Sequence, residues 1–406
     1  MIRPQSLAET QPPARWNQVA IAALAQNVAT GLAFGSFGTL VLAIERTYGA
    51  SRTQSSLAMS LAIVALSITG MLIGRVIDRV NLRNLLVLGA LVSATGFAAA
   101  AWAPDPHTLL LAYLLLIGPG TAMLGVLPSM TLATRCVPER QRGRALGIVN
   151  MPLLVMIVPL AIAPLLESYG PRTVFNLLAL IDLALIPVLL GVRGGAANHT
   201  PARTGASLPP ATAATTILRQ PAFWVLAVAM GLVTGAGTMK LAHFVPLLVG
   251  QGHNFTQANM LLALSGGAGL IGSLLFGYLA DRIGGPRALA LNAAVQAVVW
   301  TIFLAPVSLG VLTLDAIVVG ACGGGVQGAF GVTVASRFGQ QAFGRAFSLF
   351  QIATLPFLFG MTPLASLLFE RSGGYHLPMG LTVGALAFAS ILLFAVSRRP
   401  HITAGD

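Results

Sequence analysis

Gly74-Arg-Val-Ile-Asp78-Arg79 decides the fold, because this stretch returns 203 residues later as Gly277-Tyr-Leu-Ala-Asp281-Arg282. Two further matches follow at offsets of 202 and 201 residues: Ala133-Thr-Arg135 returns as Ala335-Ser-Arg337, and Gly143-Arg144-Ala145 returns as Gly344-Arg345-Ala346. Three short matches at nearly one offset indicate that the chain consists of two similar halves.

The chain is too poor in charge to be a water-soluble domain. Only 8% of its 406 residues are charged and 56% are hydrophobic, whereas a soluble domain carries about 25% charged residues. Lipid must therefore replace water over most of the surface. The 45 glycines fit this interpretation, because small residues let membrane helices approach one another closely.

Twelve apolar stretches are long enough to cross a bilayer, which takes about 20 residues. We expect spans at 17–43, 53–76, 85–102, 108–134, 145–166, 173–191, 222–249, 258–280, 288–306, 309–336, 346–369 and 377–396. The Ala-, Thr-, Pro- and Gly-rich segment that follows the sixth span predicts a linker. The expected fold is an all-α membrane protein of two six-helix bundles, with residues 1–192 in the first, 193–220 in a cytoplasmic linker and 221–406 in the second. Six spans separate the repeated motifs, so the repeat is parallel.

The positive charges predict how the chain lies in the membrane. If the amino terminus is cytoplasmic, 18 of the 23 Lys and Arg residues fall in cytoplasmic segments, four fall in outer loops, and Lys240 lies within a span. Short loops rich in Lys and Arg stay on the cytoplasmic side. We therefore expect both termini inside, in a bacterial inner membrane, and no cleaved signal peptide, because the first apolar stretch is too long for one.

Several classes of function have no support in the sequence. It contains no HExxH, GxSxG or phosphate-binding loop and no metal-spaced set of Cys and His, so we expect no enzyme activity, cofactor or metal. Cys136 and Cys322 have no CxxC spacing. The basic residues that give the net charge of +12 lie between apolar stretches rather than on one soluble surface. This argues against nucleic acid as a partner. The expected partners are a small-molecule solute, membrane lipids and a coupling proton, and we expect a monomer.

These features resemble the major facilitator superfamily over nearly the whole chain. The Gly-x-x-x-Asp-Arg loop after the second span, with its copy after the eighth, is the most specific element. The loop Arg135-Cys-Val-Pro-Glu-Arg-Gln-Arg-Gly-Arg144 is also similar to that superfamily. The resemblance implies alternating access between two parallel halves, with a solute site near the midplane.

Two stretches resemble the monocarboxylate-porter branch of the superfamily. They are YGASRTQSSLAMSL at 48–61 and His243-Phe-Val-Pro246-Leu. The branch often has an Arg on the eighth span four residues before the motif Gly, and its eukaryotic members an Asp one turn earlier, where this chain has Ser273 and Gly269. The usual partner of a substrate carboxylate is therefore missing, which leaves the substrate class open. The fifth span lacks the Gly-Pro-x-x-Gly-Gly pattern of drug/proton antiporters.

The repeated loop predicts a conformational latch, because an acid and an Arg at a span end can pair across the two halves in one conformation and separate in the other. Its residues are Gly74, Asp78, Arg79, Gly277, Asp281 and Arg282. The alternative is that they only orient the loop during insertion.

One lysine, one histidine and two aspartates lie well inside predicted spans, where each is a candidate for function. Lys240, the one lysine of the chain, is either the partner of a substrate carboxylate or a side chain that snorkels to the outer interface. His243 follows one turn later and either contacts substrate or proton or lines a polar surface. Asp315 is expected at the depth of Lys240, where the two can pair. Asp182 is either a proton-linked site or a structural acid.

Uncharged polar residues also occur within the spans. Gln26 and Asn27 on the first span and Gln327 on the tenth are candidates for substrate binding, because the resemblance places these spans around the cavity. Contacts between helices are the alternative role. Asn150 and Gln351 also lie within spans, where each must find a hydrogen-bond partner.

Three functions follow as hypotheses. The first is a secondary transporter for a small organic anion, most simply a monocarboxylate, in symport with protons. The second is an efflux carrier for drugs, with Asp182 or Asp315 as the important charge. The third, a membrane receptor without transport, is disfavoured because no soluble domain is appended.

Overall fold

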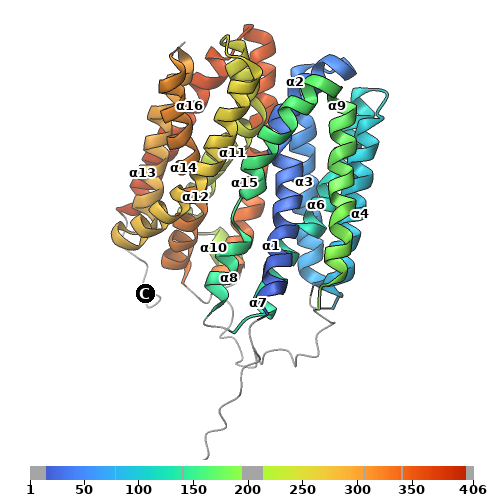
Figure 1. The fold of residues 1–406 in the computed structure, drawn as a ribbon. Helices are drawn as coiled ribbons and strands as arrows, with labels where there is room; N and C mark the ends of the chain where they lie inside the picture. Colours follow the sequence, from blue (N-terminus) through green and yellow to red (C-terminus); the bar gives the residue numbers. More distant parts are fainter. Residues whose placement is uncertain are drawn as a thin grey trace, which may run out of the picture.

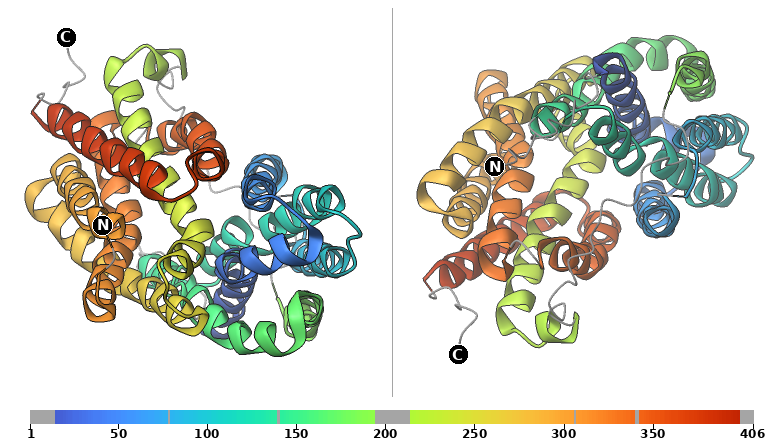
Figure 2. Two further views of the ribbon diagram at one scale, coloured as in Figure 1. Left: turned by 90° about the horizontal axis from the view of Figure 1, so that it is seen from above. Right: turned by 90° about the horizontal axis from the view of Figure 1, so that it is seen from below.

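The computed structural model of the protein describes residues 15–77, 79–138, 141–193, 214–305, 307–339 and 342–398. Within these ranges the chain is almost entirely helical and contains no strand. The helices stand side by side in two groups, the blue-to-green first half and the yellow-to-red second half (Figures 1 and 2). The predicted all-α fold of two bundles is confirmed.

The first bundle comprises α1 (Trp16–Thr30), the π-helix η1 (Gly31–Gly35), α2 (Phe37–Tyr48), α3 (Arg52–Val76), α4 (Leu82–Ala101), α5 (Pro106–Ala112), the π-helix η2 (Tyr113–Ile117), α6 (Gly118–Leu124), α7 (Val126–Arg135), α8 (Arg142–Val149) and α9 (Leu153–Leu190). Asp105 caps α5, and hydrogen bonds from Thr108 hold the pKa of this carboxyl below its usual range.

The second bundle comprises α11 (Pro221–Gly250), α12 (Phe255–Ile283), α13 (Gly285–Val299), the 3₁₀-helix η4 (Trp300–Leu304), α14 (Leu309–Phe338), α15 (Phe343–Ser372) and α16 (His376–Ser397). A short helix, α10 (Ala214–Leu218), precedes it within the segment predicted as a linker.

Helix capping repeats between the halves. Ser51 and Gln54 form a capping box at the start of α3, and Asn254 and Gln257 form one at the start of α12. In each, the cap side chain accepts a hydrogen bond from the N3 backbone N–H, and the Gln side chain accepts one from the backbone N–H of the cap residue. Both pairs are related by the offset of 203 residues that relates the Gly-x-x-x-Asp-Arg loops.

Eleven helical stretches of the described chain are long and apolar enough to cross a membrane, where twelve were expected. The difference lies in Arg144–Leu190, which has 47 residues and would measure about 70 Å as one helix, more than twice the bilayer core. Gly170, with φ 75°, turns the chain inside this stretch. The fifth and sixth predicted spans lie on either side of that turn, so the predicted number of crossings stands.

Four predicted spans are not continuous α-helices, and in the ninth the 3₁₀-helix η4 follows α13. The first contains η1, and the fourth contains η2 and a bend at Gly125. The fifth is broken between α8 and α9, where Asn150, Met151 and Pro152 are not helical. Pro152 has no N–H to donate to the preceding turn and disfavours helical geometry at Met151, so the sequence itself ends α8 here.

Each half has its own apolar core. One contains buried residues from Val19 to Val192 together with Ala242, and the other extends from Ile217 to Val396. Glycines set the closest approach in the second half: a Cβ on Gly324 would lie 2.0 Å from the Gly269 carbonyl oxygen, where α14 crosses α12. Only residues without side chains allow two helices this near.

The two ends of the bundle differ in charge. We call one the basic end, defined by Arg15, Arg135, Arg144, Arg193, Arg282, Arg337 and Arg398, which lie at or next to helix ends. The opposite end, which we call the Arg52 end, contains Glu45, Arg52, Asp105, Arg172 and Glu370.

Candidate functional site

Polar side chains of the two halves meet at the Arg52 end. Arg52 donates through Nη2 to Glu45 Oε2 at 3.0 Å and through Nη1 to the hydroxyl of Tyr375, in the second half, at 2.6 Å. Its guanidinium carbon lies 4.6 Å from the centroid of the Phe369 ring. The Arg52 and Glu45 side chains are 13% and 18% exposed, so the ion pair is largely removed from water. Arg52 therefore joins the halves with a charge that would be costly to leave unpaired.

His243 on α11 continues this network. Its Nδ1 lies 3.1 Å from Tyr375 Oη, and its Nε2 lies 3.1 Å from the Thr362 carbonyl oxygen and 3.2 Å from Ser366 Oγ. Because a carbonyl only accepts, Nε2 carries the proton and Nδ1 accepts from the Tyr375 hydroxyl. Burial raises the pKa of Tyr375 to about 12, so that hydroxyl remains a donor. Ser366 Oγ in turn donates to Ser56 Oγ of the first half at 2.7 Å.

Two further hydrogen bonds cross between the halves. The Thr53 backbone N–H donates to Glu370 Oε1 at 2.8 Å. Thr39 Oγ1 donates to Asn259 Oδ1. The backbones also come close, because a Cβ on Gly38 would lie 2.4 Å from the Leu241 carbonyl oxygen. The halves are thus held together from the Arg52 end inward.

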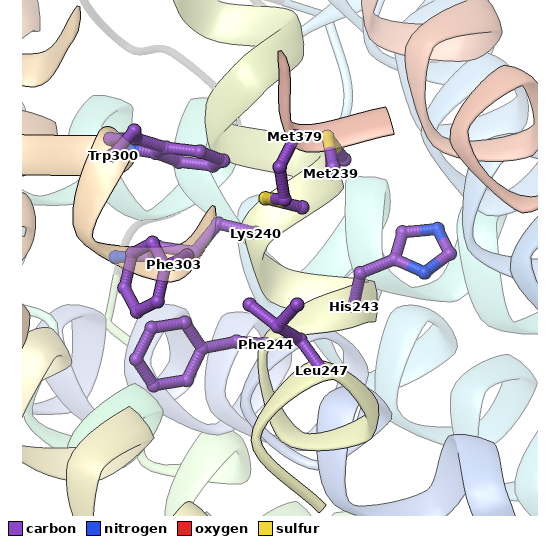
Figure 3. Close-up of a pocket in the computed structure, with 8 residues that line it drawn as sticks. All are labelled: Met239, Lys240, His243, Phe244, Leu247, Trp300, Phe303 and Met379. Atoms are coloured by element: carbon purple, nitrogen blue, oxygen red, sulfur yellow. The ribbon is translucent and has the colours of Figure 1, made fainter. Parts of the chain in front are cut away.

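Lys240 points into the second bundle and away from His243, although the two are one turn apart (Figure 3). Its Nζ donates to Ser265 Oγ of α12 at 2.8 Å. It borders a cavity of about 10 Å³, and the other residues lining this cavity are Met239, His243, Phe244, Leu247, Trp300, Phe303 and Met379. The aromatic and thioether lining leaves room for little more than one water. Lys240 therefore does not reach the outer interface in this conformation.

Two buried acids have carboxylate oxygens without a hydrogen-bond partner among the described residues. Asp315 on α14 is 2% exposed, and its charge acts on Lys240 although Lys240 Nζ bonds Ser265. Asp182 on α9 is fully buried, with the hydroxyl of Ser93 beside it. A carboxylate in such surroundings is costly to keep charged without a partner.

Gln26 and Asn27 meet the break between α8 and α9. Gln26 Nε2 donates to Asn150 Oδ1 at 2.9 Å, and Asn27 Oδ1 accepts the N–H of Leu154 at 3.1 Å. The structure thus brings both predicted residues to the same place, with Asn150 as the third member. Gln327 is exposed on α14 and takes no part in this group.

The predicted latch lies at the basic end. Asp78 falls outside the described residues. Arg79 and Asp281 are exposed, and the Arg282 guanidinium lies 5.1 Å from the centroid of the Tyr278 ring. Gly74 and Gly277 both have space for a side chain, since a Cβ on Gly74 would meet nothing nearer than 3.7 Å and one on Gly277 nothing within 4 Å.

No sequence pattern pointed to the residues of the Arg52 end. Glu45, Arg52 and Glu370 lie at predicted span ends, where charges usually face water, and nothing in one sequence pairs residues some 320 positions apart. Tyr375 lies between two spans and was also missed. The available signal was the stretch 48–61, which includes Arg52 but served only to indicate a family branch.

Comparisons with known proteins agree with this architecture. The family model of the Major Facilitator Superfamily matches residues 23–361. The MFS-type transporter YcxA of Bacillus subtilis is 26% identical over 268 residues, which is 61% of this chain and 61% of that protein. The MFS-type transporter pynF of Aspergillus niger is 25% identical and is matched over 72% of this chain and 67% of its own length.

Solved structures with the same fold include a bacterial homologue of the human lysosomal transporter Spinster, in an inward-facing and unoccupied conformation. It has a TM-score of 0.76 and 17% identity, covering 96% of this chain and 98% of that one. The nucleoside transporter NupG has a TM-score of 0.73 and 14% identity, covering 93% and 98%. At these identities the likeness concerns the fold.

Proposed function

The chain belongs to the major facilitator superfamily, and on that premise we propose that it is a secondary transporter closed at its Arg52 end. The observation that carries this proposal is the set of hydrogen bonds from Arg52, Ser366 and Thr53 between the halves. An alternating-access cycle requires such contacts to break when that end opens. The arginine distribution supports placing the basic end in the cytoplasm, so the closed Arg52 end is the outer one.

The solute that fits best is a small organic anion, such as a monocarboxylate, in symport with protons. The stretches 48–61 and 243–247 support a carboxylate, because they resemble the monocarboxylate porters. The buried carboxylate of Asp315, with Lys240 nearby, supports proton coupling, since a proton on this acid changes the charge that Lys240 faces.

Uptake by the purified protein in proteoliposomes tests this function. We expect accumulation of radiolabelled two- to four-carbon monocarboxylates inside the vesicles when the external medium is made more acidic than the lumen. A protonophore should abolish this accumulation. Transport of an apolar cation such as ethidium, without accumulation of any carboxylate, would instead establish the efflux carrier.

Charge variants in the second bundle test the coupling site. We expect Lys240→Ala to lose pH-driven accumulation, because Asp315 is left buried without a cation, and the double variant Lys240→Ala/Asp315→Asn to recover solute exchange without coupling. Lys240→Arg retains the charge and should retain part of the activity. Asp182→Asn in the other bundle is the comparison. If it uncouples transport while the Lys240 variants remain coupled, the proton site lies in the first half.

A further inference from the structure

His243 lies next to the charge that joins the two halves. Its side chain is buried, with 2% exposed, and its ring packs edge-on against the Tyr375 ring, with the centroids 5.7 Å apart. The Tyr375 hydroxyl donates to His243 Nδ1 and accepts from Arg52 Nη1 of the first half. One oxygen atom therefore lies between the imidazole and the guanidinium, so a charge on the imidazole acts directly on the contact that closes the Arg52 end.

The hydrogen bonds around this imidazole fit its neutral form. Nε2 already carries a proton, because it faces the Thr362 carbonyl oxygen, which can only accept. Nδ1 is thus the nitrogen that can take up a further proton, and a protonated Nδ1 can only donate. The Tyr375 hydroxyl would then have to accept from both His243 and Arg52, and its own proton would lose the acceptor that it has in this structure.

The charged groups around His243 also oppose a second positive charge. Arg52 already supplies one. The two carboxylates at this end are engaged elsewhere, because Glu45 pairs with Arg52 and Glu370 accepts a backbone N–H at the start of α3. Lys240, one turn away on α11, is a further cation and points into the second bundle (Figure 3). Among the described residues, no carboxylate bonds this imidazole from α2, α3, α15 or α16, so none balances an imidazolium there.

We propose that His243 Nδ1 is a proton-binding site that opens the Arg52 end, so that acid on the outer side releases the two halves from each other. When this end is open, Nδ1 meets the outer medium and binds a proton as a histidine in water does. The proton leaves before the end closes, because the Tyr375 hydroxyl can donate to Nδ1 only when that nitrogen is bare. The open form therefore binds the proton and the closed form excludes it, and a lower pH shifts the equilibrium toward the open form.

This site rests on the proposed transport cycle and adds its regulation from the outer side. It differs from the coupling proton proposed for Asp315, because a proton on His243 leaves before the Arg52 end closes and does not cross the membrane with the solute. Histidine suits this role, since its charge changes within the range of pH that a cell surface meets. The outer end of a proton-driven carrier then opens where protons are abundant.

A distance measured across the Arg52 end at different pH values tests the site without requiring transport. In the full chain with Cys136 and Cys322 replaced by serine, nitroxide labels on Thr47→Cys and Thr256→Cys report the separation of the halves by double electron–electron resonance. Both threonines are exposed, Thr47 on α2 and Thr256 on α12. A histidine in water has a pKa of about 6.5, so the ratio of open to closed molecules should rise by up to about 30-fold from pH 8 to pH 5.

Two variants and one control separate His243 from other causes of a pH response. His243→Gln does not titrate, so its ratio should change by less than about twofold over the same range. Tyr375→Phe removes the shared oxygen and keeps the ring that packs on Phe369. It should show a clearly smaller response than the unsubstituted chain, and it serves if His243→Gln fails to fold. His376→Gln is the matched control and should keep the full response, because His376 is exposed and follows Tyr375 directly.

An unchanged ratio between pH 8 and pH 5 in the unsubstituted chain would overturn this site. So would the full response in His243→Gln or in Tyr375→Phe, or its loss in His376→Gln. Uptake decides the proposed function separately. Proteoliposomes that accumulate carboxylates although the distances do not respond to pH would leave the transporter without this proton site. The full pH response without accumulation of any carboxylate would leave the site and reject the proposed solute.

Discussion

The two ends of the molecule use their charges differently. At the Arg52 end, Arg52 of the first half bonds Tyr375 of the second, 323 positions away. At the basic end, arginines bond carbonyls of their own half: Arg135 donates to Ile77 and Arg337 donates to Val396. These two arginines are related by the internal repeat, whereas Arg52 has no Arg at the equivalent position, which is Phe255. Through these bonds Arg135 and Arg337 stabilise their own bundles, whereas Arg52 joins the two bundles.

This difference explains how one end can be closed independently of the other. A contact made within one half moves with that half and does not resist its rotation. A contact made between halves must break, so it sets the relative free energies of the two conformations. The following predictions use this distinction, in order of decreasing effect.

A disulfide across the Arg52 end should stop transport completely. Ser366 Oγ and Ser56 Oγ are 2.7 Å apart, so the double variant Ser56→Cys/Ser366→Cys should form a disulfide on oxidation and hold the halves together. We expect uptake to fall to background with oxidant and to return with dithiothreitol, while each single variant remains active. Full uptake by the oxidised, cross-linked protein would show that this end need not open.

Removing the charge that joins the halves should have the next largest effect. Arg52→Ala deletes hydrogen bonds to a charged group, worth about 2–3 kcal/mol, which corresponds to a shift of roughly 30- to 150-fold in the ratio of closed to open molecules. Alkylation of a cysteine at residue 56 should become faster by a similar factor. Arg135→Ala is the comparison at the basic end and should leave this rate within about twofold. Equal rates in both variants would contradict the distinction between the ends.

His243 should contribute less than Arg52, because its hydrogen bonds lie within its own half and reach the other half only by positioning Tyr375 and Ser366. Each such bond contributes about 1 kcal/mol, so His243→Phe should accelerate alkylation at residue 56 by at most about fivefold. His243→Gln, which retains an acceptor and a donor, should restore part of the loss. If His243→Phe instead abolishes solute binding and leaves the alkylation rate unchanged, His243 belongs to the solute site.

The repeated loop at the basic end should show the smallest effects on transport. We expect Asp78→Asn to lower uptake several-fold with normal insertion, as a latch requires. Asp281→Asn should change uptake by about twofold at most, because an exposed charge contributes little. Uptake at the wild-type rate by well-expressed Asp78→Asn would leave the loop with a role in insertion only.

Orientation can be tested with no expected change in transport. A membrane-impermeant maleimide on intact cells should label a cysteine at residue 253, which precedes α12 at the Arg52 end, and should not label one at residue 205 in the linker. The reverse pattern would place the basic end outside and the closed Arg52 end in the cytoplasm.

Composition and internal repetition were sufficient to predict the fold from the sequence. Low charge, apolar stretches of about 20 residues and three motifs at one offset predict two bundles of six spans, because each of these properties is local or periodic. The sequence also contains the cause of the break at Pro152, although a continuous span was expected at 145–166. Pro159 and Pro164 lie inside α9 without ending it, so a proline count does not distinguish a break from a tolerated proline.

The sequence by itself determined that the chain crosses a membrane twelve times in two related halves, since hydrophobicity and repetition can be read along the chain. Only the tertiary structure decided which polar residues meet. Lys240 bonds Ser265 rather than Asp315, Gln26 and Asn27 meet Asn150, and Arg52 meets Tyr375. Helix rotation and the packing of glycine-rich crossings fix these partners, and neither leaves a periodic signal in one sequence.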